Sequence, residues 1–100
     1  MVAYLPRRNE GAQVKEPPPP DDWRRQGQEE YLRGVRLLHM AYVPYRPGWE
    51  HDHCEFCYAR LSQSEGDLQV GYTTTDHYRW ICEDCFADFC DEFEWKVQEG

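Results

Sequence analysis

The sequence lacks any long apolar run. A membrane-spanning helix needs about 20 consecutive apolar residues, whereas this chain of 100 residues is 30% charged and has a mean hydropathy of -0.94. The stretch 1–20 has no apolar block either, which argues against a secretory signal. We therefore expect one small domain in the cytoplasm, with no membrane span.

The cysteines are odd in number. Five cysteines argue against a closed disulfide framework, and the cytoplasm keeps thiols reduced. A chain of this length buries a limited core, so many domains of its size depend on a metal, on disulfides or on a partner. We expect folding here to depend on a metal.

Basic residues are scarce in the second half of the chain. Residues 1–50 hold 8 basic and 7 acidic side chains, whereas residues 51–100 hold 3 basic and 12 acidic ones, and the whole chain has a net charge of -8. An acidic surface repels nucleic-acid phosphate and attracts basic proteins. The charge pattern therefore favours a basic protein partner over nucleic acid.

Signs of catalysis are also lacking. The sequence shows no nucleophile–base pair and no phosphate-binding loop. His51-Asp52-His53 invites comparison with His-Asn-His nucleases, but those enzymes place the catalytic histidine on the hairpin, whereas these histidines precede the first cysteine pair. We predict that the protein is not an enzyme.

Composition divides the chain into two parts. Residues 1–20 end in four prolines and are predicted to be a flexible Pro-rich tail with a stiff polyproline end; an arm ordered by docking of Tyr4 and Leu5 is the alternative. Residues 21–100 are predicted to form one zinc-binding domain, with a helix over 21–42 and a zinc unit over 49–97. The predicted helix has an apolar stripe formed by Trp23, Gly27, Tyr31, Val35, Leu38 and Tyr42.

Two Cys-x-x-Cys pairs carry the strongest signal. They are Cys54–Cys57 and Cys82–Cys85, separated by 24 residues. This spacing lets both sulfurs of each turn face one point, and four thiolates form a tetrahedral site that suits one structural Zn²⁺ with no open position. Redox pairs, free thiols, an iron–sulfur site, and His51 or His53 in place of a cysteine are the alternatives.

The elements around the cysteines predict an α+β fold. A hairpin is expected over 68–81 and a helix is expected to begin near Cys82. A knuckle, a hairpin and a helix carrying the second pair are the order of a treble-clef zinc finger. A zinc ribbon, with both pairs on hairpin knuckles, is the alternative. Cys90 lies on the apolar face of the last helix and is expected to be a buried free thiol.

One face of the last helix carries the candidate partner-binding residues. At helical spacing, the carboxylates of Asp84, Asp88, Asp91 and Glu92 share this face. We expect them to bind a basic protein; a merely solvated face is the alternative. A nucleic-acid regulator would instead use Arg25, Arg33 and Arg36 of the first helix.

The cysteine pairs and their flanking residues resemble a known group of proteins. The stretches 49–57 (with His-Asp-His-Cys-Glu-Phe-Cys), Gly71-Tyr72, 80–89 (with Trp-Ile-Cys-Glu-Asp-Cys-Phe) and 95–97 are similar to small uncharacterised bacterial four-cysteine zinc-binding proteins. Some of these occur near polymorphic-toxin genes, where small acidic proteins often serve as immunity proteins. The resemblance implies an inhibitor of a toxin-like partner. It also implies zinc ligands at Cys54, Cys57, Cys82 and Cys85.

Overall fold

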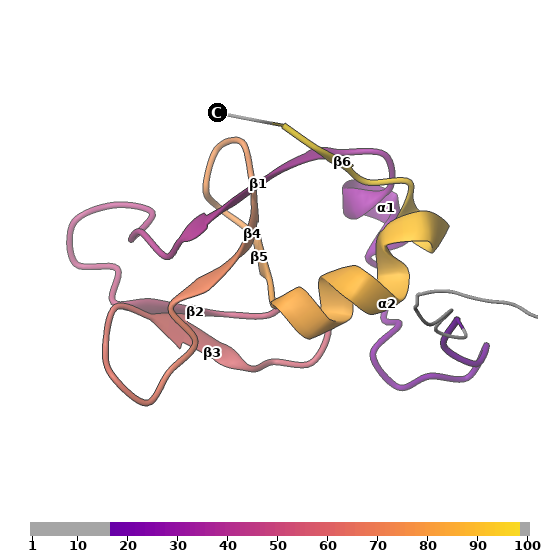
Figure 1. Cartoon of the computed structure of the whole chain (residues 1–100), viewed down its shortest axis with the longest axis horizontal. Coiled ribbons are helices and arrows are strands. Elements are labelled where there is room, and N and C mark those ends of the chain that lie inside the picture. Colours follow the sequence, from indigo (N-terminus) through magenta and orange to yellow (C-terminus); the bar gives the residue numbers. More distant parts are fainter. Residues whose placement is uncertain (1–16, 99–100) are drawn as a thin grey trace, which may run out of the picture.

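The computed structural model describes residues 17–98 and shows a small α+β fold of short elements (Figure 1). The bounds, in chain order, are α1 Glu29–Leu32, β1 Arg36–Ala41, β2 His51–His53, β3 Arg60–Ser62, β4 Val70–Thr74, β5 Trp80–Ile81, α2 Glu83–Phe93 and β6 Lys96–Val97. Of the predicted tail, residues 1–16 lie outside the described part of the chain.

The strands form two sheets. The larger has the order β5-β4-β1-β6, in which β6 is parallel to β1 and the other pairs are antiparallel. The smaller is the antiparallel pair β2–β3, in which His51 lies opposite Ser62. In Figure 1, α1 and β6 lie side by side near the end of α2, and the main-chain N–H of Gly34 donates to the carbonyl of Phe93 at 2.7 Å.

The predicted helix over 21–42 is wrong. The segment forms turns, the one-turn helix α1 and the central strand β1. Gly27 and Gly34 have φ values of 90° and 76°, which interrupt a right-handed helix. Strand β1 gains hydrogen bonds from β4 on one side and β6 on the other, so pairing with distant strands outweighs the local helical spacing.

The exposures confirm that no helical stripe forms. Trp23 is 63% exposed and Tyr31 is 42% exposed, although both belong to the predicted stripe. Leu32 and Leu37, which lie outside it, are fully buried. Of the six predicted positions, only Tyr42 is buried.

The predicted hairpin and last helix are both confirmed. Strands β4 and β5 pair with Tyr72 opposite Ile81, within the expected range 68–81. Helix α2 begins directly after Cys82, whose sulfur accepts the main-chain N–H of Cys85 as an N-cap. It ends where Glu94 adopts a left-handed conformation with φ 58°.

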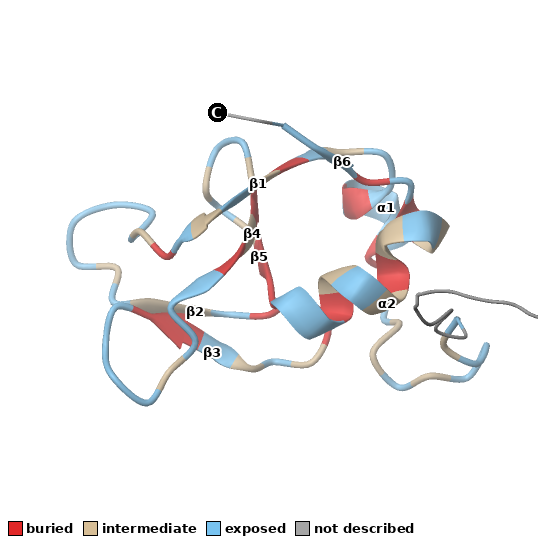
Figure 2. Cartoon of the chain, viewed as in Figure 1, coloured by how far each residue is buried: buried red, intermediate tan, exposed pale blue. Residues whose placement is uncertain are grey.

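The apolar core joins α2 to the first cysteine turn. Phe56 stacks on Phe89 with ring centroids 4.8 Å apart and meets Phe93 edge-on at 5.3 Å. Figure 2 shows buried residues on α2, on β5 and on the strands beside them. The core is therefore built directly against the cysteines.

Within residues 17–98, no helix is long and apolar enough to cross a bilayer.

Candidate metal centre

The four predicted cysteines lie together. Their sulfur atoms are all within 4.8 Å of one another, and those of Cys57 and Cys82 are 3.6 Å apart. A tetrahedral site with zinc–sulfur bonds of about 2.3 Å has sulfur–sulfur edges of about 3.8 Å. The cluster therefore has the size of a four-thiolate metal site. Among the described residues it is the only such group of three or more potential ligands.

The first pair is held by a tight turn that follows β2. The main-chain N–H of Cys54 donates to the carbonyl of Ala59 at 2.8 Å, and the N–H of Tyr58 donates to the carbonyl of Cys54 at 3.0 Å. Tyr58 has a φ of 66°, a left-handed conformation that closes the turn. The N–H of Glu55 also donates to the carbonyl of Trp80 at 2.9 Å, which fastens this turn to β5.

The second pair is placed by the junction of β5 and α2. Cys82 follows the last residue of β5, and Cys85 lies in the first turn of α2. Because β5 is bonded to the first turn, the end of the strand brings the second pair to the first. The 24 intervening residues therefore return the chain to its starting point through β3 and the β4–β5 hairpin.

Main-chain N–H groups surround the sulfurs. Cys54 accepts from the N–H of Phe56 at 3.4 Å and of Cys82 at 3.3 Å, and Cys82 accepts from Cys85 at 3.4 Å. Such bonds stabilise thiolates. Hydrogen bonds from the Cys82 and Cys85 side chains hold the pKa of Cys54 well below its usual value, and the same contacts raise the pKa of those two thiols. Full deprotonation of the cluster therefore calls for a cation at its centre.

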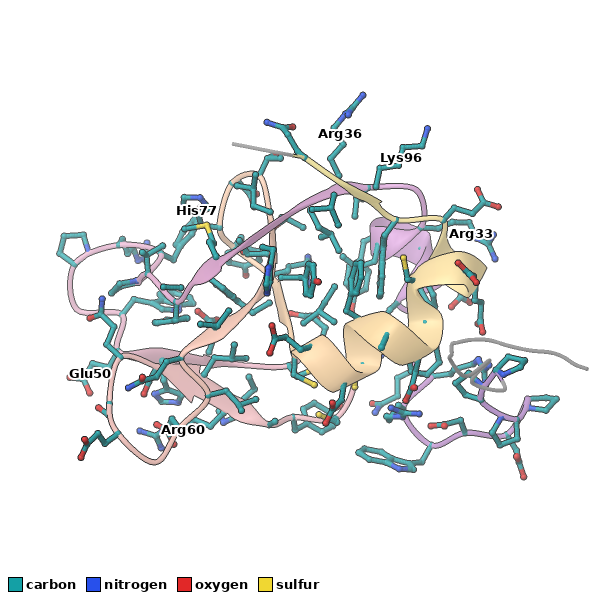
Figure 3. All side chains as sticks on the ribbon, in the orientation of Figure 1. Arg33, Arg36, Glu50, Arg60, His77 and Lys96 are labelled. Carbon is teal, nitrogen blue, oxygen red and sulfur yellow. The ribbon has the colours of Figure 1, made fainter. Side chains whose placement is uncertain are left out.

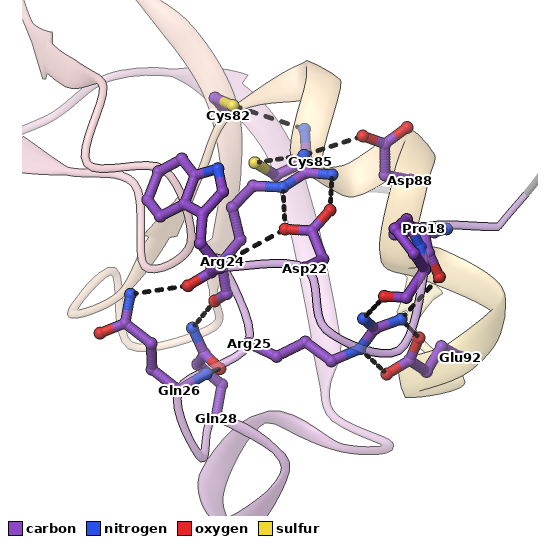
Figure 4. A network of polar contacts seen from close by, with 12 residues as sticks. Pro18, Asp22, Arg24, Arg25, Gln26, Gln28, Cys82, Cys85, Asp88 and Glu92 are labelled. Atoms are coloured by element: carbon purple, nitrogen blue, oxygen red, sulfur yellow. Dashed lines mark hydrogen bonds and ion pairs between the residues drawn. The ribbon is translucent and has the colours of Figure 1, made fainter.

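Arg24 connects the N-terminal segment to this cluster (Figure 4). Its guanidinium donates to the Cys85 sulfur at 3.5 Å and to Asp88 at 2.8 Å, and it forms a two-pronged pair with Asp22. It also lies 4.7 Å from the ring centroid of Phe89. The hydrogen bonds from Arg24 lower the pKa of Asp22 to about 2. Arg24 is thus a charged residue in direct contact with one of the four clustered sulfurs.

A buried glutamine provides a second connection. Gln28 is 1% exposed, and its side-chain amide donates to the carbonyls of Arg24 at 2.7 Å and Glu55 at 2.9 Å. Sequence reasoning missed both Gln28 and Arg24. One signal was present, because at helical spacing Arg24 lies beside Trp23 and Gly27 on the predicted apolar stripe, where a charged residue is unusual. Gln28 left no comparable signal.

The predicted acidic face of α2 is divided by these contacts. Asp88 pairs with Arg24, and Glu92 pairs with Arg25 at 2.7 Å (Figure 4). Asp84 and Asp91 are exposed and have no ion pair among the described residues. Two of the four candidate partner-binding carboxylates therefore hold the N-terminal segment, and two face solvent.

The remaining candidates lie away from the four sulfurs. His51 and His53 lie on β2 with ring centroids 5.0 Å apart, and neither belongs to the cluster. The Cys90 thiol is half-buried and lies 3.9 Å from the carbonyl of Trp95. Burial raises the pKa of the Cys90 thiol. The cluster therefore contains only the four predicted cysteines.

The arginines of the alternative hypothesis do not form one basic face. Arg25 is paired with Glu92, and Arg33 lies 3.6 Å from Glu94. Arg36 lies opposite Lys96 in the sheet, and Figure 3 shows Arg33, Arg36 and Lys96 along one edge of the molecule. The predicted helix over 21–42, which would have placed Arg25, Arg33 and Arg36 on one side, does not form.

Comparison with known proteins adds no assignment. The chain matches no protein-family model, no curated protein and no solved structure at a significant level. Any functional proposal therefore depends on the residues and the geometry described above.

Proposed function

We propose that the protein is a small zinc-stabilised interaction module that binds a basic protein partner and acts by covering a site on it. The observation that supports a metal site is that the four cysteine sulfurs lie within 4.8 Å of one another. Four thiolates are a donor set that prefers Zn²⁺, and they leave no position open for a substrate. When bound, the metal would supply cross-linking of the fold rather than reactivity.

The arrangement around the cysteines supports a treble-clef finger. The first pair follows β2 in a tight turn, the β4–β5 hairpin comes next, and the second pair lies at the start of α2. A ribbon would need the second pair on a hairpin turn, whereas Cys82 caps a helix of 11 residues. The helical setting of the second pair favours the treble clef.

Charge supports a basic partner. The half of the chain that carries the cysteines has 12 acidic and 3 basic side chains, and four thiolates with Zn²⁺ would add a further formal charge of -2. Asp84 and Asp91 expose carboxylates along α2. Such a field speeds association with a cationic surface, and occlusion of that surface is how an inhibitor of the immunity type would work.

Nucleic-acid binding is the weaker candidate. It requires a continuous basic surface, whereas Arg25 is paired with Glu92 and Arg33 lies 3.6 Å from Glu94.

A charge-reversal capture experiment tests the proposal. The tagged full-length protein is used to recover partners from its native lysate at moderate salt, with nuclease treatment as a control. We expect a basic protein in near-equal amount, lost with Asp84→Lys/Asp91→Lys and retained with the matched variant Glu50→Lys/Glu65→Lys. Figure 3 shows Glu50 at the end of the molecule away from α2.

Two results would contradict the proposed function. Recovery of nucleic acid, or of proteins that disappear after nuclease treatment, would favour the regulator hypothesis. Equal recovery by both double variants would show that the exposed carboxylates of α2 do not contact the partner.

A further inference from the structure

A groove of about 530 Å³ lies over the cysteine cluster. Cys57, Cys82 and Cys85 contribute to its lining. Its walls include Trp23, Leu68 and Val70, which are 63%, 42% and 40% exposed. Large apolar side chains gathered around one hollow are unusual on a small protein surface and typically mark a binding site.

The lining of the groove combines apolar and acidic side chains. Glu83 and Asp84 lie in the lining, and Asp84 has no ion pair among the described residues. With the metal bound as proposed above, the four thiolates and Zn²⁺ carry a formal charge of -2. Arg24 also lines the groove, but its guanidinium is already held by Asp22 and Asp88. The two carboxylates outnumber the single guanidinium, so the net charge of the lining is negative and attracts a cation.

We propose that this groove binds an arginine side chain of the basic partner. The aliphatic stem would lie along the apolar walls, as long cationic side chains do on apolar surface. The guanidinium would stack on the Trp23 indole, the aromatic ring that attracts cations most strongly, and would face Asp84 and the thiolates. Arginine suits this environment better than lysine because guanidinium is planar and less strongly hydrated. The inference deepens the proposed function and rests on its metal and its basic partner.

A titration of the zinc-loaded, full-length protein with two matched peptides tests the inference. The first is acetyl-Leu-Arg-Leu-amide, and the second replaces arginine with citrulline, which keeps the shape and removes the charge. We expect amide shifts at Cys57 and Asp84 and a shift of the Trp23 indole N–H. The citrulline peptide should bind about tenfold more weakly or not at all, the loss expected for a charged hydrogen bond.

Variants locate the binding site. Trp23→Ala and Asp84→Asn should each weaken binding of the arginine peptide several-fold. Asp91→Asn removes another exposed α2 carboxylate, which lies outside the groove, and should leave binding unchanged. Trp23 is mostly exposed, so its replacement should not unfold the protein. Zinc content and thermal unfolding of each variant confirm that the centre is intact.

Four results would contradict the inference or one of its premises. Equal affinity for the citrulline peptide would remove the charge argument. Amide shifts at Asp91 and not at the groove residues would show that the arginine binds elsewhere on α2, which contradicts the inference but not the proposed function. A native protein that contains no zinc would contradict the metal proposal itself. Tighter peptide binding by Arg7→Gln/Arg8→Gln/Lys15→Gln would show that the chain's own N-terminal segment occupies the groove.

Discussion

Two regions of the molecule differ in what determines their conformation. The first is the cysteine unit over 49–97, and the second is the N-terminal segment over 17–41. In the first, covalent spacing and a helix cap place the four cysteines, so the local sequence and the structure agree. In the second, turns, a four-residue helix and a central strand replace the expected helix. The difference shows that local signals are sufficient where a cap and a tight turn dominate. They fail where hydrogen bonds to distant strands decide the conformation.

The largest effect should come from breaking the cysteine unit. Cys82→Ser removes a proposed zinc ligand but keeps an N-cap on α2, so we expect loss of the metal and of cooperative unfolding because of the lost thiolate. A structural zinc site contributes about 10–16 kcal/mol of binding free energy, more than a small domain's net stability. Native mass spectrometry and thermal unfolding with and without chelator provide the measurements.

The matched control for that variant is Cys90→Ser, which removes the fifth cysteine from the same helix. It should retain one zinc per chain and change the free energy of unfolding by about 1 kcal/mol or less. A Cys82→Ser protein that unfolds cooperatively without metal would defeat the structural-zinc proposal.

A smaller effect is expected at the contact between the two regions. Arg24→Gln removes a guanidinium, 16% exposed, that pairs with both Asp22 and Asp88. We expect the free energy of unfolding to fall by about 2–4 kcal/mol. Zinc transfer to a chelator should also become faster, because the Cys85 thiolate loses a donor. Denaturant unfolding and a zinc-release assay measure the two effects.

Arg25→Gln is the comparison for Arg24→Gln. It removes a neighbouring arginine whose ion pair with Glu92 is more exposed, so its cost should be about 1 kcal/mol or less, with no change in zinc release. If both substitutions lowered the free energy of unfolding equally and left zinc release unchanged, the Arg24 ion pair would be no more important than the exposed Arg25 pair.

The smallest expected effect has an informative sign. In a helix over 21–42, Gly34→Ala would stabilise the protein by about 1 kcal/mol. In the structure, Gly34 has a φ of 76°, so alanine there should destabilise it by about 1–2 kcal/mol. Equilibrium unfolding of the wild type and this variant distinguishes the two conformations. A more stable variant would support a helix over 21–42.

Much of the candidate metal centre could be predicted. The two Cys-x-x-Cys pairs, the hairpin between them and the helix start at Cys82 were all readable from spacing and periodicity. Cys90 was correctly kept apart from the four clustered cysteines because it follows the apolar face of α2. These features depend on residues within a few positions of one another, where backbone geometry leaves few choices.

The contacts of α2 with the N-terminal segment could not be predicted. Helical spacing correctly placed Asp88 and Glu92 with Asp84 and Asp91, but it could not show that Arg24 and Arg25 would cover two of the four. Those contacts join residues 64 and 67 positions apart. No local sequence pattern contains such a pairing. The sequence therefore could not show that two of the four carboxylates on this face of α2 form ion pairs within the protein.

The sequence by itself determined the two cysteine pairs, the hairpin and the last helix, because short-range spacing and capping govern each of them. Only the tertiary structure decided that β1 is a strand, that Arg24 lies behind the Cys85 sulfur and that a groove opens over the cysteines. Each of these requires elements far apart in the chain to meet, and the free energy that selects them comes from burial and pairing between those elements.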